Sequence, residues 1–494
     1  MTGIAAASLL IGCGGGAVQE PGPAWEECAG YARTATETTV YGLLPAMRCA
    51  RIEVPLDHAN PGGGTIRLAV SRIPARGESL GSLVLNPGGP GGSGLFGAAT
   101  TALQLDGRSP LLDRFDLIGV DPRGVGASVP AVDCYTDAEA DRNAVPATAI
   151  GTTVSWTPED TRALLDRCAA GSGGVGVLTR LGTRDAARDL DRVRAALGDE
   201  KLTFLGQSYG TRLGAVYAEQ FPDRVRAMLL DGGIDPHQGT AARRVAAFAG
   251  FQAAFDRMAA SCATRQGCPL GTDPARATTE FQRIVQPLYE TPVPALGGEL
   301  RFDDAIGGVI SGLYAEAAWP RIIKGLIQLQ AGRGDELAQL GYDFGGRDAN
   351  GAWTNFPEAN YAINCMDEER LTVAQGDALR AEILRAAPFM DPGAPLTGAR
   401  DGCEHWPAAP TLGYPYAVGI EGLPGTLVVS ITGDPTTPHA GGVRLAETLG
   451  SSLLTVEGEG HTIVTSGASD CVNRVAADYL IHLRTPAPGA TCTL

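Results

Sequence analysis

Lysine, Cys-x-x-Cys pairs and long apolar runs are scarce or missing from this 494-residue sequence. Almost all cations are arginines, and the formal net charge of −16 disfavours nucleic acid or an anionic membrane surface as a partner. The lack of Cys-x-x-Cys argues against a zinc ribbon or a thioredoxin-like site. The apolar stretch at residues 4–11 is far shorter than the about 20 residues that a membrane-spanning helix needs.

The first residues have the character of an export signal. The apolar stretch at residues 4–11 suits the central region of a signal peptide. The segment Leu-Ile-Gly-Cys that ends at Cys13 resembles the lipobox of bacterial lipoproteins, although no Lys or Arg precedes the apolar run. We expect an exported protein, either extracellular or held at the cell surface by a lipid on Cys13. The alternative is an apolar N-terminal stretch without a targeting role.

The cysteine count also favours export. Without Cys13 ten cysteines remain, an even number, as expected of an oxidised exported protein. Ten cysteines allow about 945 pairings. Chain order offers one simple proposal, in which neighbours pair: Cys28 with Cys49, Cys134 with Cys168, Cys262 with Cys268, Cys365 with Cys403, and Cys471 with Cys492.

Short apolar runs that end in turn residues alternate with helix-like segments along much of the chain. Runs such as "SLVLN", "FDLIGV", "LTFLGQ", "RAMLLD", "TLVVSITG" and "SSLLTVEGE" are typical of buried, mostly parallel strands. The pattern predicts an α/β fold with a mostly parallel central sheet. Between residues 237 and 424 helical patterns dominate, which indicates a largely helical cap inserted into the sheet domain. We divide the chain into a signal peptide and lipobox (1–13), a polar tether (14–40), the first part of the core (41–236), the cap (237–424) and the second part of the core (425–494).

One serine stands out as a candidate nucleophile. Gly-x-Ser-x-Gly occurs twice, around Ser79 and around Ser208, and the motif is weak by itself. A nucleophile elbow joins a strand to a helix. Ser208 follows the run "LTFLGQ" and precedes a helix-like segment, whereas Ser79 precedes a strand. We therefore expect Ser208 to be the nucleophile and Ser79 to have no catalytic role.

A serine nucleophile needs a general base and an acid that orients the base. Asp434 ends the run "TLVVSITGD", and His461 follows the next run, "SSLLTVEGEG". The other five histidines lie in positions that indicate structural or solvated roles. The order Ser208, Asp434, His461, each after a strand, predicts a catalytic triad.

Acyl transfer also needs donors for a developing oxyanion. The backbone N–H of Tyr209, directly after the nucleophile, is one candidate. The glycine-rich loop "NPGGPGGSG" follows a predicted strand and can supply the second donor from Gly88 or Gly89. The alternative is an ordinary Gly/Pro loop.

Together these segments resemble the tripeptidyl aminopeptidase and prolyl iminopeptidase branch of the α/β-hydrolases, and more closely secreted bacterial hydrolases with a TAP-like C-terminal region. The matching pieces are "NPGGPGGSG", "DPRGVGAS", "LTFLGQSYGT", "FPDRVRAMLLDG", "GDPTTP" and "GEGHT". The resemblance implies an α/β-hydrolase fold and places the family's triad on Ser208, Asp434 and His461. One departure is Pro87, which stands where iminopeptidases have a histidine, so strict proline specificity is not implied.

The resemblance implies a serine exopeptidase that releases short peptides from free N-termini, with a peptide as its substrate and with no metal or organic cofactor. One alternative is a secreted esterase or lipase with the same triad, because the fold does not distinguish the two. Another is a surface lipoprotein that uses an inactive hydrolase fold for binding.

An exopeptidase must hold the substrate's ammonium group, and acidic residues of the cap are candidates. Asp367 and Glu368 lie in "NCMDEER", and Glu404 lies in "DGCEHWP". If Cys365 pairs with Cys403, the two segments are held together and their carboxylates could face the cleft. The alternative is a solvated acidic surface next to a bracing disulfide.

Overall fold

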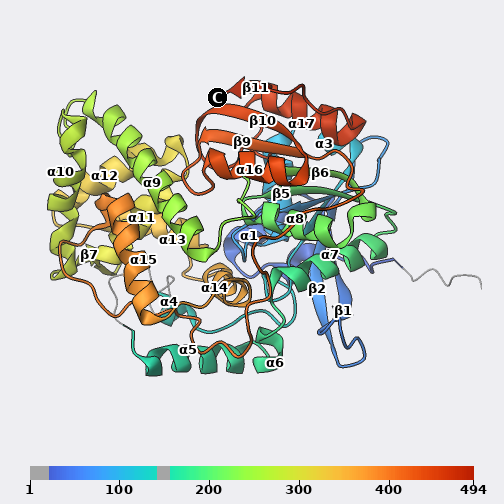
Figure 1. Cartoon of the computed structure of the whole chain (residues 1–494), viewed down its shortest axis with the longest axis horizontal. Helices are drawn as coiled ribbons and strands as arrows, with labels where there is room; N and C mark the ends of the chain where they lie inside the picture. Colours follow the sequence, from blue (N-terminus) through green and yellow to red (C-terminus); the bar gives the residue numbers. More distant parts are fainter. Residues whose placement is uncertain (1–21, 142–155) are drawn as a thin grey trace, which may run out of the picture.

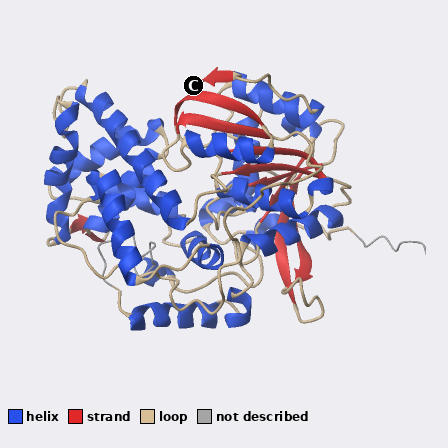
Figure 2. Cartoon of the chain, in the orientation of Figure 1, coloured by secondary structure: helices blue, strands red, loops and turns tan. Residues whose placement is uncertain are grey.

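A nine-stranded sheet forms the centre of the computed structural model, which describes residues 22–141 and 156–494. The strand order is β1-β2-β4-β3-β5-β6-β9-β10-β11. β2 pairs antiparallel with β1 and β4, and all pairs from β4 to β11 are parallel, which confirms the predicted mostly parallel sheet (Figure 2). The strands are β1 (Arg48–Pro55), β2 (Thr65–Ile73), β3 (Ser82–Asn86), β4 (Asp116–Val120), β5 (Leu202–Gln207), β6 (Val225–Asp231), β9 (Leu427–Gly433), β10 (Ser452–Glu459) and β11 (Thr491–Thr493).

Helices cover both faces of the sheet, which explains why its central strands are continuous apolar runs. All six residues of β5 are buried, and alternate side chains enter opposite cores. Phe204 packs with residues of α7 and α8, and Leu205 packs with residues of α2 and α17. The α-helices outside the cap are α1 (Ala35–Gly42), α2 (Gly94–Leu105), α3 (Leu111–Arg114), α4 (Asp137–Ala140), α5 (Pro158–Gly171), α6 (Val175–Leu178), α7 (Thr183–Ala196), α8 (Tyr209–Gln220), α16 (His439–Leu449) and α17 (Asp470–His482).

The chain between β6 and β9 forms the helical cap, which lies to one side of the sheet (Figure 1). Most cap helices pack around a hydrophobic core of their own, which includes Phe255, Phe281 and Phe389. Helix α14 differs, because Ala359, Ala362 and Ile363 join the core beside the sheet. The cap contains α9 (Thr240–Ala263), α10 (Ala277–Val285), α11 (Phe302–Leu313), α12 (Trp319–Gln330), α13 (Asp335–Gly345), α14 (Phe356–Asp367), α15 (Val373–Ala386) and a hairpin of β7 (Val293–Ala295) and β8 (Gly298–Leu300).

The predicted tether at residues 14–40 is folded wherever the structure describes it, so this expectation was wrong for residues 22–40. Glu26 forms a bridge with Cys49 next to β1, and a disulfide joins Cys28 to Cys49. Helix α1 (Ala35–Gly42) begins at a capping box in which Thr34 and Glu37 satisfy each other's backbone N–H groups. The low apolar periodicity of this segment concealed a short helix that begins at a capping box and lies between two disulfide-bonded cysteines.

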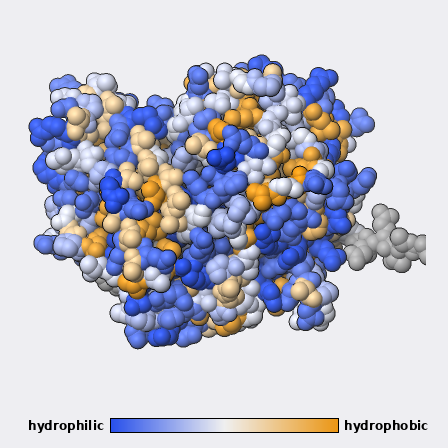
Figure 3. Space-filling view, viewed as in Figure 1, coloured by the Kyte–Doolittle hydropathy of each residue, from blue (hydrophilic) through white to orange (hydrophobic). Residues whose placement is uncertain are grey.

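Five disulfides are present, and they join the pairs that chain order predicted. Cys13 lies outside the described residues. Figure 3 shows a mostly hydrophilic face, with hydrophobic residues gathered in a band along the cap and in patches over the sheet domain. Within the described ranges, no helix is both long and apolar enough to cross a membrane.

Candidate active site

Ser208 stands at a tight turn between β5 and α8. Its φ of 55° and ψ of −121° lie in a region that non-glycine residues rarely adopt. The turn needs close packing of the flanking glycines: a Cβ on Gly206 would lie 2.3 Å from the carbonyl oxygen of Gly210. The N–H of Ser208 donates to the carbonyl of Asp231 at 2.8 Å, which ties the turn to β6. This is the geometry of a nucleophile elbow.

Ser79 has none of these features. It lies in an exposed loop before β3, and its hydroxyl accepts a hydrogen bond from the N–H of Gly81 at 3.1 Å. The strand-to-helix context therefore separates the two Gly-x-Ser-x-Gly matches in the structure as it does in the sequence.

Asp434 and His461 form a hydrogen-bonded pair beyond the ends of β9 and β10. Nδ1 of His461 lies 3.0 and 2.9 Å from the two carboxylate oxygens of Asp434. The carboxylate also accepts hydrogen bonds from the N–H groups of Thr436 at 3.0 Å and Thr437 at 2.9 Å. The Thr437 hydroxyl donates to it at 2.8 Å. With Nδ1 engaged by Asp434, Nε2 is the ring nitrogen left for exchange of a proton with a nucleophile.

Thr437 also lies next to the histidine, with its hydroxyl oxygen 3.2 Å from Nδ1 of His461. Sequence reasoning did not place Thr437 at the site. The signal was present, because Thr437 lies three residues after Asp434, within reach of that carboxylate. Its second role depends on the tertiary position of His461, which the local pattern does not give.

The cap contributes directly to the setting of His461. The N–H of His461 donates to the carbonyl of Tyr314 at 3.0 Å, and the two rings meet edge to face with centroids 5.4 Å apart. Tyr314 follows α11, about 150 residues before the histidine. Sequence reasoning missed this residue because nothing in the sequence around Tyr314 points to the site.

A buried carboxylate supports the segment after His461. Asp231 ends β6 and accepts hydrogen bonds from the N–H groups of Ile463 at 2.7 Å and Val464 at 2.8 Å. Burial raises the pKa of Asp231 to about 6, and the two backbone donors offset only part of that effect. Asp231 therefore links the strand beside Ser208 to the loop that carries His461.

The glycine-rich loop lies against the nucleophile. A Cβ on Gly88 would be 2.9 Å from Cβ of Ser208 and 3.2 Å from the backbone nitrogen of Tyr209, so only glycine fits there. The N–H of Gly88 already donates to the Asn86 side chain at 3.1 Å. Of the two predicted loop donors, Gly89 is therefore the better candidate. Tyr209 begins α8, where backbone N–H groups have no partner within the helix.

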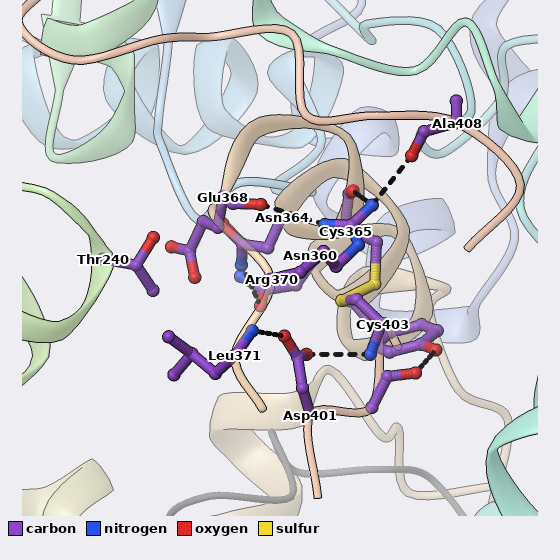
Figure 4. Close-up of a disulfide and its surroundings, with 12 residues drawn as sticks. Thr240, Asn360, Asn364, Cys365, Glu368, Arg370, Leu371, Asp401, Cys403 and Ala408 are labelled. Carbon is purple, nitrogen blue, oxygen red and sulfur yellow. Dashed lines mark hydrogen bonds between the residues drawn. A yellow bond between two sulfur atoms is a disulfide. The ribbon is translucent and has the colours of Figure 1, made fainter. Parts of the chain in front are cut away.

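The disulfide Cys365–Cys403 joins the two acidic segments of the cap, as expected (Figure 4). Two charged side chains beside the disulfide are hydrogen-bonded within the protein. The Asp401 carboxylate accepts hydrogen bonds from the N–H groups of Leu371 at 2.8 Å and Cys403 at 2.9 Å. Arg370 donates to the carbonyls of Cys365 and Ala408.

The carboxylates proposed to bind a substrate ammonium have partners within the protein, so that prediction needs correction. Asp367 is fully buried and accepts hydrogen bonds from the N–H and hydroxyl of Thr183. Its carboxylate lies 3.8 Å from Arg212. Glu404 accepts hydrogen bonds from Thr161 at 2.6 Å and Arg400 at 2.8 Å.

Glu368 is the clearest of these cases. Its carboxylate forms ion pairs with Arg243 and with Arg244, the latter at 2.7 Å. Burial alone would raise its pKa, but the two guanidinium groups outweigh burial and lower the pKa to about 2. Sequence reasoning counted the acids of this region and not the arginines that the fold brings to them from α8 and α9.

Comparisons with known proteins agree with this geometry. The model of the alpha/beta hydrolase fold family matches residues 81–468. Serine protease Hip1 of Mycobacterium tuberculosis is 42% identical over 459 residues, which cover 90% of this chain and 87% of Hip1. Carboxylesterase B of the same organism is 38% identical over 97% of this chain and 91% of its own length. Tripeptidyl aminopeptidase of Streptomyces lividans is 31% identical over 95% of this chain and 86% of its own length. The chain belongs to the α/β-hydrolase family, in the branch that includes these proteins.

Proposed function

We propose that the protein is a serine peptidase that works through an acyl-enzyme. The observation that carries the proposal is the strained turn at Ser208 in one sheet with the hydrogen-bonded pair Asp434–His461. The similarity to a protein named serine protease, over most of both chains, supports a peptide as the substrate.

In this mechanism Nε2 of His461 takes the Ser208 proton while the serine oxygen attacks the scissile carbonyl. The N–H groups of Tyr209 and Gly89 stabilise the oxyanion. His461 then protonates the leaving amine, and a water molecule releases the acyl group along the same path. Asp434 fixes the imidazole tautomer and stabilises the imidazolium.

The finer proposal is that the enzyme releases short peptides from free N-termini. Its support is the similarity to a tripeptidyl aminopeptidase over most of both chains. The ammonium would have to be held by groups other than Asp367 and Glu368, whose charges are already compensated.

Carboxylic ester hydrolysis is the second candidate activity, because a relative named carboxylesterase is 38% identical over nearly the whole chain. The same three residues would carry it, since the triad attacks esters and amides alike. A non-catalytic binding role is the third candidate, and it predicts that Ser208 is unreactive.

One substrate panel tests all three candidates. We expect purified protein to react with a fluorophosphonate at Ser208 and to cleave a tripeptide anilide faster when its N-terminus is free than when it is acetylated. Equal cleavage of both anilides would contradict the exopeptidase assignment. Cleavage of a short acyl ester but of neither anilide would identify an esterase. Absence of fluorophosphonate labelling would favour the binding role.

We also propose that the protein works outside the cytoplasm. Five disulfides are typical of chains that fold in oxidising compartments. Lipidation of Cys13 remains part of this proposal and is tested by the mass of the mature N-terminus.

A further inference from the structure

Four aromatic rings of the cap form a continuous row that ends at the catalytic elements. Phe251 of α9 contacts Tyr314, with ring centroids 5.5 Å apart. Tyr314 contacts Phe344 of α13 at 5.0 Å, and Phe344 contacts Phe356 of α14 edge to face at 5.8 Å. The row therefore brings together residues from four separate segments of the cap.

Both neighbours of Phe344 in this row touch the candidate active site. Tyr314 packs on the ring of His461 and accepts the N–H of that residue. Phe356 packs on the glycine-rich loop, where a Cβ on Gly89 would lie 3.0 Å from Cε2 of Phe356. Phe344 thus lies between the ring that contacts the general base and the ring that contacts the loop that would hold the acyl carbonyl.

Phe344 is the exposed member of the row. Its side chain is 44% exposed, whereas Tyr314 and Phe356 are half-buried. Single exposed apolar residues are common on protein surfaces, so exposure alone carries no conclusion. What distinguishes Phe344 is its position between two rings that touch His461 and Gly89.

The surface around Phe344 suits an uncharged group. The neighbouring Asp343 accepts a hydrogen bond from Arg321 at 2.9 Å, and Arg347 donates to Asp141 at 2.6 Å. These charges are compensated within the protein. A phenyl face flanked by paired charges and aromatic rings attracts apolar and aromatic side chains, and the paired Asp343 and Arg347 give a charged side chain no ion-pair partner there.

We propose that Phe344 is a specificity-determining residue, which binds an apolar, preferably aromatic, side chain on the acyl side of the bond that is cleaved. The acyl side follows from the contact of Phe356 with Gly89, because that loop would hold the acyl carbonyl. This inference rests on the proposed function and extends it to the substrate class. It applies to peptides and to esters alike, since both place an acyl group against the same loop.

The test compares two substrates that share one leaving group and differ at the acyl residue, namely the p-nitroanilides of Ala-Ala-Phe and Ala-Ala-Ala. The Phe344→Ala variant should lose about 10-fold or more in kcat/KM on the first and less than about twofold on the second, because a missing apolar contact costs about 10-fold or more. Phe344→Leu should retain most of the activity on the aromatic substrate. The p-nitrophenyl esters of 4-phenylbutyrate and butyrate form a second pair that serves an esterase.

Tyr289 provides the matched control, because it is an aromatic residue of the cap with 41% exposure in a different segment. Tyr289→Ala should leave both substrates unchanged. Equal losses on the aromatic and the alanine substrate, or the same loss in Tyr289→Ala, would overturn the role of Phe344 and leave the peptidase proposal intact. If wild-type protein cleaves none of the four substrates, the proposed function fails and the inference fails with it.

Discussion

At the residue scale, the two serines in Gly-x-Ser-x-Gly motifs give the first prediction. Ser208→Ala should reduce kcat by at least about 10³-fold, because the nucleophile is lost while binding and the oxyanion donors remain. Ser79→Ala should stay near wild type, because its hydroxyl only bonds the neighbouring backbone. Steady-state kinetics on the best substrate of the panel measures both, and an inactive Ser79→Ala variant would contradict the assignment of the elbow.

Thr437 gives a second prediction at this scale. Thr437→Val removes the hydroxyl that donates to Asp434 while keeping the shape of the side chain. A hydrogen bond to a charged group contributes about 1.5–3 kcal/mol, so kcat should fall about 10- to 100-fold with little change in KM. Thr437→Ser keeps the hydroxyl and should retain most of the activity.

Thr432 is the control for this experiment, since it is an exposed threonine on β9, the strand that precedes Asp434, and its hydroxyl is 3.5 Å from the carbonyl of Gly458. Thr432→Val should leave kcat unchanged. A large rise in KM in Thr437→Val, with kcat unchanged, would show that Thr437 binds substrate instead of orienting the acid.

The triad and the glycine-rich loop could be predicted because each lies next to a recognisable pattern in the local sequence. Ser208, Asp434 and His461 end apolar runs at turns, and the glycine loop is visible as a motif. The acidic residues of the cap misled for the opposite reason. Their chemistry depends on Arg212 and Arg243, which come from distant segments, and one sequence does not show which charges meet.

At the element scale, α14 connects the cap to the core through a buried acid. Glu358 accepts hydrogen bonds from the N–H groups of Cys134 at 3.0 Å and Tyr135 at 3.2 Å. Burial raises the pKa of Glu358 to about 7, which the two donors only partly offset. The folded state therefore holds this proton more tightly than the unfolded chain does, and stability falls as the pH rises from about 4.5 towards 7.

The third prediction follows from this linkage. Glu358→Gln has no carboxyl proton to lose. The difference in free energy of unfolding between variant and wild type should therefore shift in favour of the variant by about 1–3 kcal/mol as the pH rises from 5 to 8. Urea denaturation of both proteins at the two pH values measures the difference. Glu382→Gln, an exposed change on α15, should show no such trend. A difference that is constant with pH would show that Glu358 titrates alike in both states.

The elements themselves were predicted unevenly. The parallel strands β3, β4, β5, β6 and β9 were recognisable because burial on both faces makes them apolar along their length. Helix α1 and the hairpin of β7 and β8 were missed, because short elements depend on caps, turns and disulfides more than on periodicity. Helix α14 lies in the segment that we assigned to the cap, but it packs beside the sheet. A division of the chain into consecutive segments cannot predict this packing.

At the scale of the whole molecule, the five disulfides give the fourth prediction. Intact protein alkylated without reduction should carry no label on the ten paired cysteines, and at most one label on Cys13. Mass mapping after proteolysis measures this, and prior reduction provides the positive control with ten further labels. Two or more labelled cysteines among the ten would contradict an oxidised native state.

The contact between Tyr314 and His461 makes the candidate active site depend on the cap. A sheet domain that has folded ahead of its cap lacks the carbonyl that holds the histidine's backbone, and it lacks Asn360, whose amide donates to the carbonyl of Pro90 in the glycine loop at 2.9 Å. We therefore expect full hydrolytic activity only when both halves are assembled. We expect a chain whose cap has not yet folded to cleave neighbouring chains and itself poorly.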